Sequence, residues 1–168
     1  TPILLGSSQA AKFKKEGQKK ETKFKNSAYL VTPKNLKLQN QSYGKVRLMP
    51  FGEHLPYADI IPWSWIDAEG INDYVPGDKY TVFQLEEARF SVTICWENLF
   101  ADLVRNFVKN GAQFIVNITN EAWFGETAAP YQFLSMSVFR AVENGVYVVR
   151  SANTGVSCVI DPCGRILD

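Results

Sequence analysis

One cysteine in this sequence lies where a thiol can act as a nucleophile. Cys95 follows an apolar, β-branched run, residues 90–94, that is typical of a buried strand, and a helix-like pattern begins a few residues later. At such a junction backbone N–H groups converge, and the local field favours the thiolate. A free cysteine usually behaves as a small buried hydrophobe, so Cys95 taken alone predicts core packing.

A lysine and two carboxylates supply groups that could activate this thiol. Lys45 and Glu53 lie in one segment whose prolines and glycines forbid a long helix, and Glu97 follows Cys95 by two residues. A nearby ammonium favours the thiolate and then stabilises the oxyanion of a tetrahedral intermediate, while a carboxylate can serve as the base. These residue types therefore suit covalent catalysis by a thiol.

Other chemistries have less support. His54 is the only histidine, so no Cys/His set has metal-ligand spacing, and ordinary Cys–His catalysis would have to use His54 as its base. Neither a glycine-rich phosphate loop nor a Gly-x-Ser-x-Gly motif occurs in the sequence. The carboxylates also have structural interpretations: Glu53 could cap a turn or pair with Arg47, and Glu97 could be a favourable charge at a helix start.

Length and composition describe one domain of ordinary size. A chain of 168 residues that is 46% hydrophobic can bury a core, and a net charge of +1 gives no reason to expect nucleic acid. Three cysteines exclude a complete disulfide framework, and we expect Cys158 and Cys163 to be unpaired, although a bridge across the turn between them stays open. No signal peptide and no apolar run of about 18 residues is visible. Since the chain opens on a strand without an initiator methionine, we expect it to be part of a longer protein.

The apolar patterns predict the elements that must position these groups. Helical spacing extends from Leu99 to a stop at Gly111, and from Pro130 to a stop at Gly145. Strands are expected at residues 3–6, 26–32, 36–38, 80–85, 89–94, 113–118, 146–150 and 156–160, and a short amphipathic turn at 60–66. This alternation of strands and helices predicts an α/β chain with a mixed sheet covered on both faces.

A polar stretch at about residues 9–25 is expected to be a mobile loop. It contains seven lysines and two glutamates between Lys12 and Lys25, and few apolar residues, so it cannot bury enough surface to offset its ordering entropy. Such a loop could contact an anionic membrane surface, although a solvated insertion is the simpler interpretation.

Further polar residues lie at the ends of predicted strands or on a predicted helix. Asn120, Glu121 and Arg150 end strands, where α/β proteins commonly build sites. Arg140 and Glu143, three residues apart, could be no more than a surface ion pair.

Five motifs in chain order make the sequence resemble a known family. Residues 43–53, which include Lys45 and end in Pro-Phe-Gly-Glu, resemble the lysine loop of bacterial apolipoprotein N-acyltransferases, members of the nitrilase (carbon–nitrogen hydrolase) superfamily. Ile94-Cys95-Trp96-Glu97 resembles their Cys-Tyr-Glu nucleophile motif. Residues 119–125 are similar to their Thr-Asn-Asp-x-Trp-Phe-Gly segment, and residues 140–143 and 150–157 match further stretches. The resemblance covers roughly residues 26–168.

The resemblance implies an α-β-β-α sandwich and a Glu-Lys-Cys catalytic set. It makes Cys95 the nucleophile and Lys45 the residue that stabilises the oxyanion. Glu53 and Glu97 become supporting carboxylates. Trp96, Trp123 and Phe124 would shape the acyl pocket, although the last two could equally be core aromatics.

The resemblance also implies an activity. The family transfers a fatty acyl chain from a phospholipid to the N-terminal amine of a diacylglyceryl-cysteine apolipoprotein, through a cysteine thioester and without a metal or organic cofactor. Its site is on the periplasmic side of the bacterial inner membrane, to which transmembrane segments absent from this chain attach it. Its general-base glutamate would lie upstream of residue 1, so we expect a domain truncated at its N-terminus that is inactive alone. Two alternatives stay open, a soluble nitrilase-type amidase that hydrolyses a small C–N bond and a catalytically dead nitrilase-like binding domain.

Overall fold

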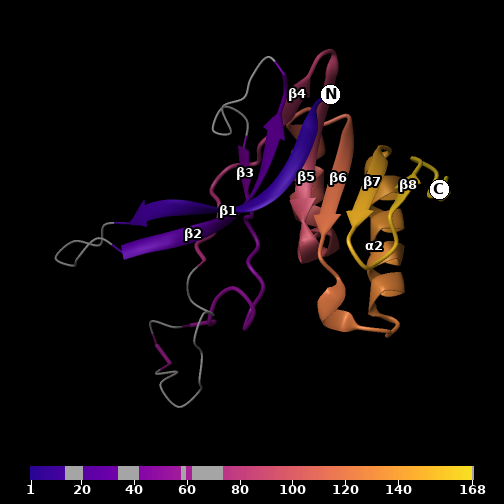
Figure 1. The fold of residues 1–168 in the computed structure, drawn as a ribbon. Helices are drawn as coiled ribbons and strands as arrows, with labels where there is room; N and C mark the ends of the chain where they lie inside the picture. Colours follow the sequence, from indigo (N-terminus) through magenta and orange to yellow (C-terminus); the bar gives the residue numbers. More distant parts are fainter. Residues whose placement is uncertain (14–20, 34–41, 58–59, 62–73, 168) are drawn as a thin grey trace.

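The computed structural model describes residues 1–13, 21–33, 42–57, 60–61 and 74–167, and these form two β-sheets with helices beside them (Figure 1). A three-stranded antiparallel sheet has the order β1 (Ile3–Phe13), β2 (Glu21–Val31), β3 (Ser42–Gly44). A five-stranded sheet has the order β4 (Phe83–Leu85), β5 (Ala88–Ile94), β6 (Phe114–Thr119), β7 (Tyr147–Ala152), β8 (Cys158–Ile160).

Two parallel crossovers form the centre of the larger sheet. Helix α1 (Ala101–Lys109) connects β5 to β6, and α2 (Ala129–Asn144) connects β6 to β7. Both connections step the same way along the strand order, so both helices cover one face of the sheet. In Figure 1, α2 lies behind β7 and β8. The edge strands β4 and β8 pair antiparallel, and the sheet is therefore mixed, as predicted.

The three-stranded sheet packs on the other face. Strand β2 contacts β5, and a Cβ added to Gly6 of β1 would lie 3.2 Å from Ile118 Cδ1 of β6. Ala28, Leu30 and Tyr43 share one buried core with the apolar residues of β5. Sheet, sheet and helices thus form successive layers, in agreement with the expected sandwich fold.

The hairpin of β1 and β2 is longer than predicted. Residues 9–25 were expected to form a loop, but β1 continues to Phe13 and β2 begins at Glu21, and these two residues pair. Ladder hydrogen bonds join backbone groups, so a polar sequence does not prevent them. Paired strand therefore replaces the expected loop at residues 9–13 and 21–25, while 14–20 lie outside the described residues. The expected strand at 36–38 and most of the turn at 60–66 lie outside them too.

Both helices end close to the predicted glycines. Gly111, two residues after α1, has φ +100°, and Gly145, directly after α2, has φ +63°. Glycine reaches this left-handed region at little cost, which explains both stops. Within the described part of the chain, no helix is long and apolar enough to cross a membrane. Cys158 and Cys163 are free thiols, as expected.

Candidate active site

Cys95 lies at a sharp turn at the end of β5, as the sequence predicted. Ile94 is extended, with φ −104° and ψ 120°, whereas Cys95 has φ +56° and begins the 3₁₀-helix η2 (Cys95–Leu99). A left-handed backbone costs a non-glycine residue about 1–2 kcal/mol, so surrounding contacts must hold it. The turn leaves Cys95 partly exposed at the carboxyl end of a parallel strand, where α/β proteins build sites.

Lys45 follows β3 and is 2% exposed. Its Nζ lies 2.9 Å from each carboxylate oxygen of Glu53. Asn26 Nδ2 donates to Glu53 Oε1 at 2.9 Å, and the Met49 N–H donates to Oε2 at 2.8 Å. Glu53 therefore pairs with Lys45. One of its structural interpretations, an ion pair with Arg47, is wrong.

The backbone of Lys45 is also held from both sides. Its N–H donates to the Asn26 carbonyl at 2.8 Å, and its carbonyl accepts from the Gly77 N–H at 2.7 Å. A Cβ at position 77 would collide with the Gly44 carbonyl, so glycine allows this close approach. Asn26 thus contacts Lys45 directly and acts on it again through Glu53. Asn26 is not among the residues predicted from the sequence, because nothing near it in the chain signals a partner in another segment.

One carboxylate joins the lysine segment to the cysteine turn. Glu97 is completely buried and accepts hydrogen bonds from the segments that carry Lys45 and Cys95. The donors are the Tyr43 hydroxyl at 2.7 Å and the backbone N–H groups of Val46 at 2.7 Å, Arg47 at 3.0 Å and Ile94 at 2.9 Å. Since Val46 follows Lys45 and Ile94 precedes Cys95, the two segments meet at the Glu97 carboxylate.

Burial dominates the electrostatics of this junction. Burial raises the pKa of Glu97 above its usual value, against the opposing effect of the N–H donors of Arg47 and Ile94. Burial, reinforced by the adjacent Glu97, raises the pKa of Tyr43 far above its usual range. Tyr43 therefore stays protonated and remains a hydrogen-bond donor to Glu97.

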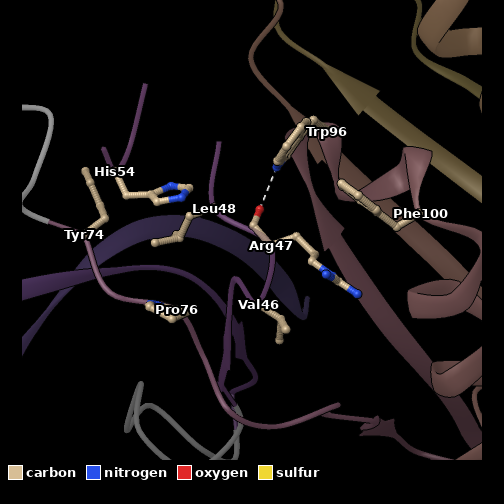
Figure 2. Close-up of a pocket in the computed structure, with 8 residues that line it drawn as sticks. All are labelled: Val46, Arg47, Leu48, His54, Tyr74, Pro76, Trp96 and Phe100. Carbon is tan, nitrogen blue, oxygen red and sulfur yellow. Dashed lines mark hydrogen bonds between the residues drawn. The ribbon is translucent and has the colours of Figure 1, made fainter. Parts of the chain in front are cut away.

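A groove of about 410 Å³ lies beside the lysine segment (Figure 2). Its lining comes from Val46, Arg47, Leu48, His54, Tyr74, Pro76, Trp96 and Phe100. Trp96 Nε1 donates to the Arg47 carbonyl at 2.6 Å, and its ring meets Phe100 edge-on with 5.0 Å between centroids. Trp96 is thus one wall of this groove.

The other two aromatic candidates lie elsewhere, in the 3₁₀-helix η3 (Ala122–Phe124). Trp123 is 86% exposed, so it is not a core aromatic. Phe124 packs on Phe133 with 5.2 Å between ring centroids. Neither is among the residues that line the groove, and their contribution to a substrate pocket stays a prediction.

Two strand-end candidates, Glu121 and Arg150, form an ion pair in the interior. Both side chains are fully buried, and Arg150 Nη2 donates to Glu121 Oε1. Arg150 also donates to Asn117 Oδ1 at 3.0 Å and to Ser137 Oγ at 3.3 Å. A Cβ at Gly155 would collide with Glu121 Oε2, so a glycine makes room for this carboxylate. These two residues belong to a buried polar network that joins strands β6 and β7 of the five-stranded sheet to α2.

Arg140 and Glu143 form the expected ion pair at 2.9 Å. Arg140 is nevertheless buried and donates to the Leu99 carbonyl at 2.8 Å, so it joins α2 to η2 and is more than a surface charge.

Comparison with known proteins gives a consistent result. The profile of the family described as carbon-nitrogen hydrolase matches residues 3–168. An apolipoprotein N-acyltransferase from Geobacter metallireducens is 42% identical over 92% of this chain and 29% of its own length. Apolipoprotein N-acyltransferase 1 from Treponema pallidum is 37% identical over 99% of this chain and 31% of its own length. This chain thus spans less than a third of the length of these curated relatives.

Solved structures share the fold. An amidase from Nesterenkonia sp. superposes with a TM-score of 0.64 and 24% identity, over 98% of this chain and 56% of that one. Nit3 from Saccharomyces cerevisiae, of the nitrilase superfamily, gives a TM-score of 0.61 and 24% identity, over 86% and 48%.

Proposed function

This chain belongs to the carbon–nitrogen hydrolase family, and from that premise we propose that it is part of the catalytic domain of a bacterial apolipoprotein N-acyltransferase. Relatives that carry this name share 37–42% identity with most of the chain. The observation that carries the proposal is the position of the Glu97 carboxylate. It accepts from the N–H of Val46, next to Lys45, and from the N–H of Ile94, next to Cys95, and these two neighbours are the proposed catalytic pair.

In the first half-reaction, the Cys95 thiolate attacks the carbonyl carbon of a phospholipid acyl ester. A C–S bond forms and the ester C–O bond breaks, and the lysophospholipid leaves as an alcohol that carries the proton from the thiol. The Lys45 ammonium stabilises the oxyanion of the tetrahedral intermediate, and Glu53 keeps that ammonium in place.

In the second half-reaction, the N-terminal amine of the apolipoprotein attacks the thioester. A C–N bond forms, the C–S bond breaks, and the proton lost by the amine returns to Cys95. An acyl-enzyme that links two separate substrates implies ping-pong kinetics. A phospholipid donor must reach the site from a bilayer, and we place this reaction at the periplasmic face of the inner membrane because the family resemblance implies that location.

Mass spectrometry of the complete protein tests the proposal. After incubation with phosphatidylethanolamine vesicles of one acyl composition, we expect one acyl mass on the peptide that contains Cys95. A synthetic peptide with an N-terminal diacylglyceryl-cysteine should remove the adduct and gain the same mass. The Cys95→Ala variant should form no adduct, whereas Cys163→Ser, which removes an exposed thiol, should behave as the unmodified protein does.

Two other outcomes would overturn it. Turnover of a small amide in the absence of lipid would indicate a soluble amidase. A protein that neither acquires an acyl mass nor hydrolyses an amide would indicate a binding domain without catalysis.

A further inference from the structure

The turn at Cys95 receives a side chain from the neighbouring strand. Asn117 lies on β6, is completely buried, and extends its amide across to the end of β5. Its Nδ2 lies 3.2 Å from the Cys95 carbonyl, 3.2 Å from the Thr93 carbonyl and 3.1 Å from Thr93 Oγ1. Asn117 thus hydrogen-bonds the carbonyl of the residue whose backbone is left-handed.

Arg150 determines which way this amide faces. Arg150 Nη1 lies 3.0 Å from the other end of the Asn117 side chain, and a guanidinium has only donors. The oxygen of Asn117 must therefore face Arg150, and the NH₂ group must face the turn. Glu121 and Ser137 hold Arg150 in turn, so the orientation is set by side chains from β7, α2 and the segment after β6.

We propose that Asn117 is a positioning residue for Cys95. It holds the left-handed turn that presents the thiol, and Arg150 fixes the orientation of its amide. The inference deepens the function proposed above and rests on it for the reaction in which Cys95 takes part. It predicts that Asn117 controls the reactivity of the thiol itself, and not only the stability of the sheet.

The Asn117→Asp variant separates these two roles. It keeps the size of the side chain and an oxygen toward Arg150, but it replaces the donor to the Cys95 carbonyl with an acceptor. The matched control is Thr93→Val, which removes another partner of the same amide and leaves the contact to Cys95 intact. Both changes disturb the same buried contact region, so both should lower the melting temperature.

Alkylation of Cys95 by iodoacetamide, followed by peptide mass mapping in the complete folded protein, reads out the reactivity. We expect Asn117→Asp to slow it about tenfold, as the loss of a buried hydrogen bond and its replacement by repulsion would do, and Thr93→Val to change it less than about twofold. In the phospholipid assay, Asn117→Asp should lower the kcat of the acylation step and leave the KM for the lipid unchanged.

The outcomes distinguish this inference from the proposed function. If Asn117→Asp and Thr93→Val are alkylated and acylated at the same rates, Asn117 only stabilises the core and the inference is wrong. If alkylation slows in Asn117→Asp while the unmodified protein forms no acyl adduct, positioning by Asn117 holds and the acyltransferase proposal fails. Should Asn117→Asp not fold, Asn117→Ser removes the amide without adding a charge and is held to the same expectations.

Discussion

Two ion pairs with almost no exposed surface on their cations differ in how their carboxylates are placed. Lys45 pairs with Glu53, whose side chain is 14% exposed and lies in a loop after the three-stranded sheet. Arg150 pairs with Glu121, and both side chains have no exposed surface. The first pair reaches the surface through its carboxylate, whereas the second has no exposed side-chain surface. We call Lys45–Glu53 the accessible pair and Arg150–Glu121 the sealed pair.

The pairs also differ in what would remain after one partner is lost. Without Lys45, Glu53 would keep the donors from Asn26 and Met49. Without Glu121, Arg150 would keep a buried charge with only neutral partners. Burial of the cation alone therefore does not distinguish a candidate catalytic ion pair from a structural one, whereas the exposure of the carboxylate does.

The largest expected effect is a loss of stability when the sealed pair is broken. Glu121→Gln should lower the free energy of unfolding by about 3–5 kcal/mol, because it leaves a buried guanidinium without a counter-charge. Urea denaturation measures this loss. The control is Asp102→Asn at Arg47, an ion pair in which both side chains are exposed, and there the loss should stay below about 1 kcal/mol. Equal losses at the two sites would contradict the assigned role of the sealed pair.

The next largest effect is a loss of reaction rate when the accessible pair is broken. Lys45→Met should slow acylation of Cys95 by a factor of about 10² to 10³, as removal of an oxyanion-stabilising donor does. The free energy of unfolding should change by less than about 1.5 kcal/mol, since Glu53 keeps its other donors. Lys79→Met, at an exposed lysine, is the control, and an equal fall in rate for both variants would remove Lys45 from the mechanism.

A smaller change tests the space around the sealed pair. Gly155→Ala should cost about 1–3 kcal/mol, because the new Cβ collides with Glu121 Oε2. Adding Glu121→Asp, which shortens the carboxylate, should restore part of the loss in a double-mutant cycle. Gly52→Ala is the control, since its Cβ would meet Met49 Cγ at an ordinary 3.4 Å. Additive effects of the two changes would show that position 155 does not contact the pair.

The smallest expected effect is on how the free energy of unfolding depends on pH, through Tyr43, which lies two residues before Lys45. The folded state holds the Tyr43 proton well above pH 10, whereas the unfolded chain loses it near pH 10. The contribution of Tyr43 is therefore complete below pH 10 and declines above it, by about 0.8 kcal/mol at pH 10.5. Urea midpoints measured from pH 9 to 10.5 should show less decline in Tyr43→Phe and the unaltered decline in Tyr131→Phe, at an exposed ring.

Local sequence patterns predicted the central part of the fold. The other parts depend on pairing between distant segments, which local patterns do not reveal. The helices after β5 and β6 followed from apolar spacing and a glycine stop, both of which are local. The full length of the β1–β2 hairpin could not be predicted in this way, because the polar outer half of each strand is stabilised by pairing with the other strand. The candidate site behaves in the same way: motifs proposed Lys45, Glu53 and Cys95, but the contact of Asn26 with Glu53 joins residues 27 positions apart.

Asn117 shows which signal was available and unused. It lies within an apolar strand that was predicted to be buried, and a buried amide must find hydrogen-bond partners. A polar residue inside such a strand therefore predicts a contact across the sheet. The identity of that contact, the Cys95 carbonyl, depends on the parallel register of β5 and β6, which the chain does not reveal locally.

The arrangement of Glu97 has a consequence for how this site can adapt to its substrates. A single carboxylate accepts from the N–H groups of Val46 and Ile94, so the backbone next to Lys45 and the backbone next to Cys95 are tied to each other. Under the proposed function, lipids with longer or shorter acyl chains would therefore not be accommodated by moving these two segments apart. The same proposal then predicts that variants with a wider choice of acyl chain are found at Trp96 and Phe100, the aromatic residues that meet in the groove beside the lysine segment.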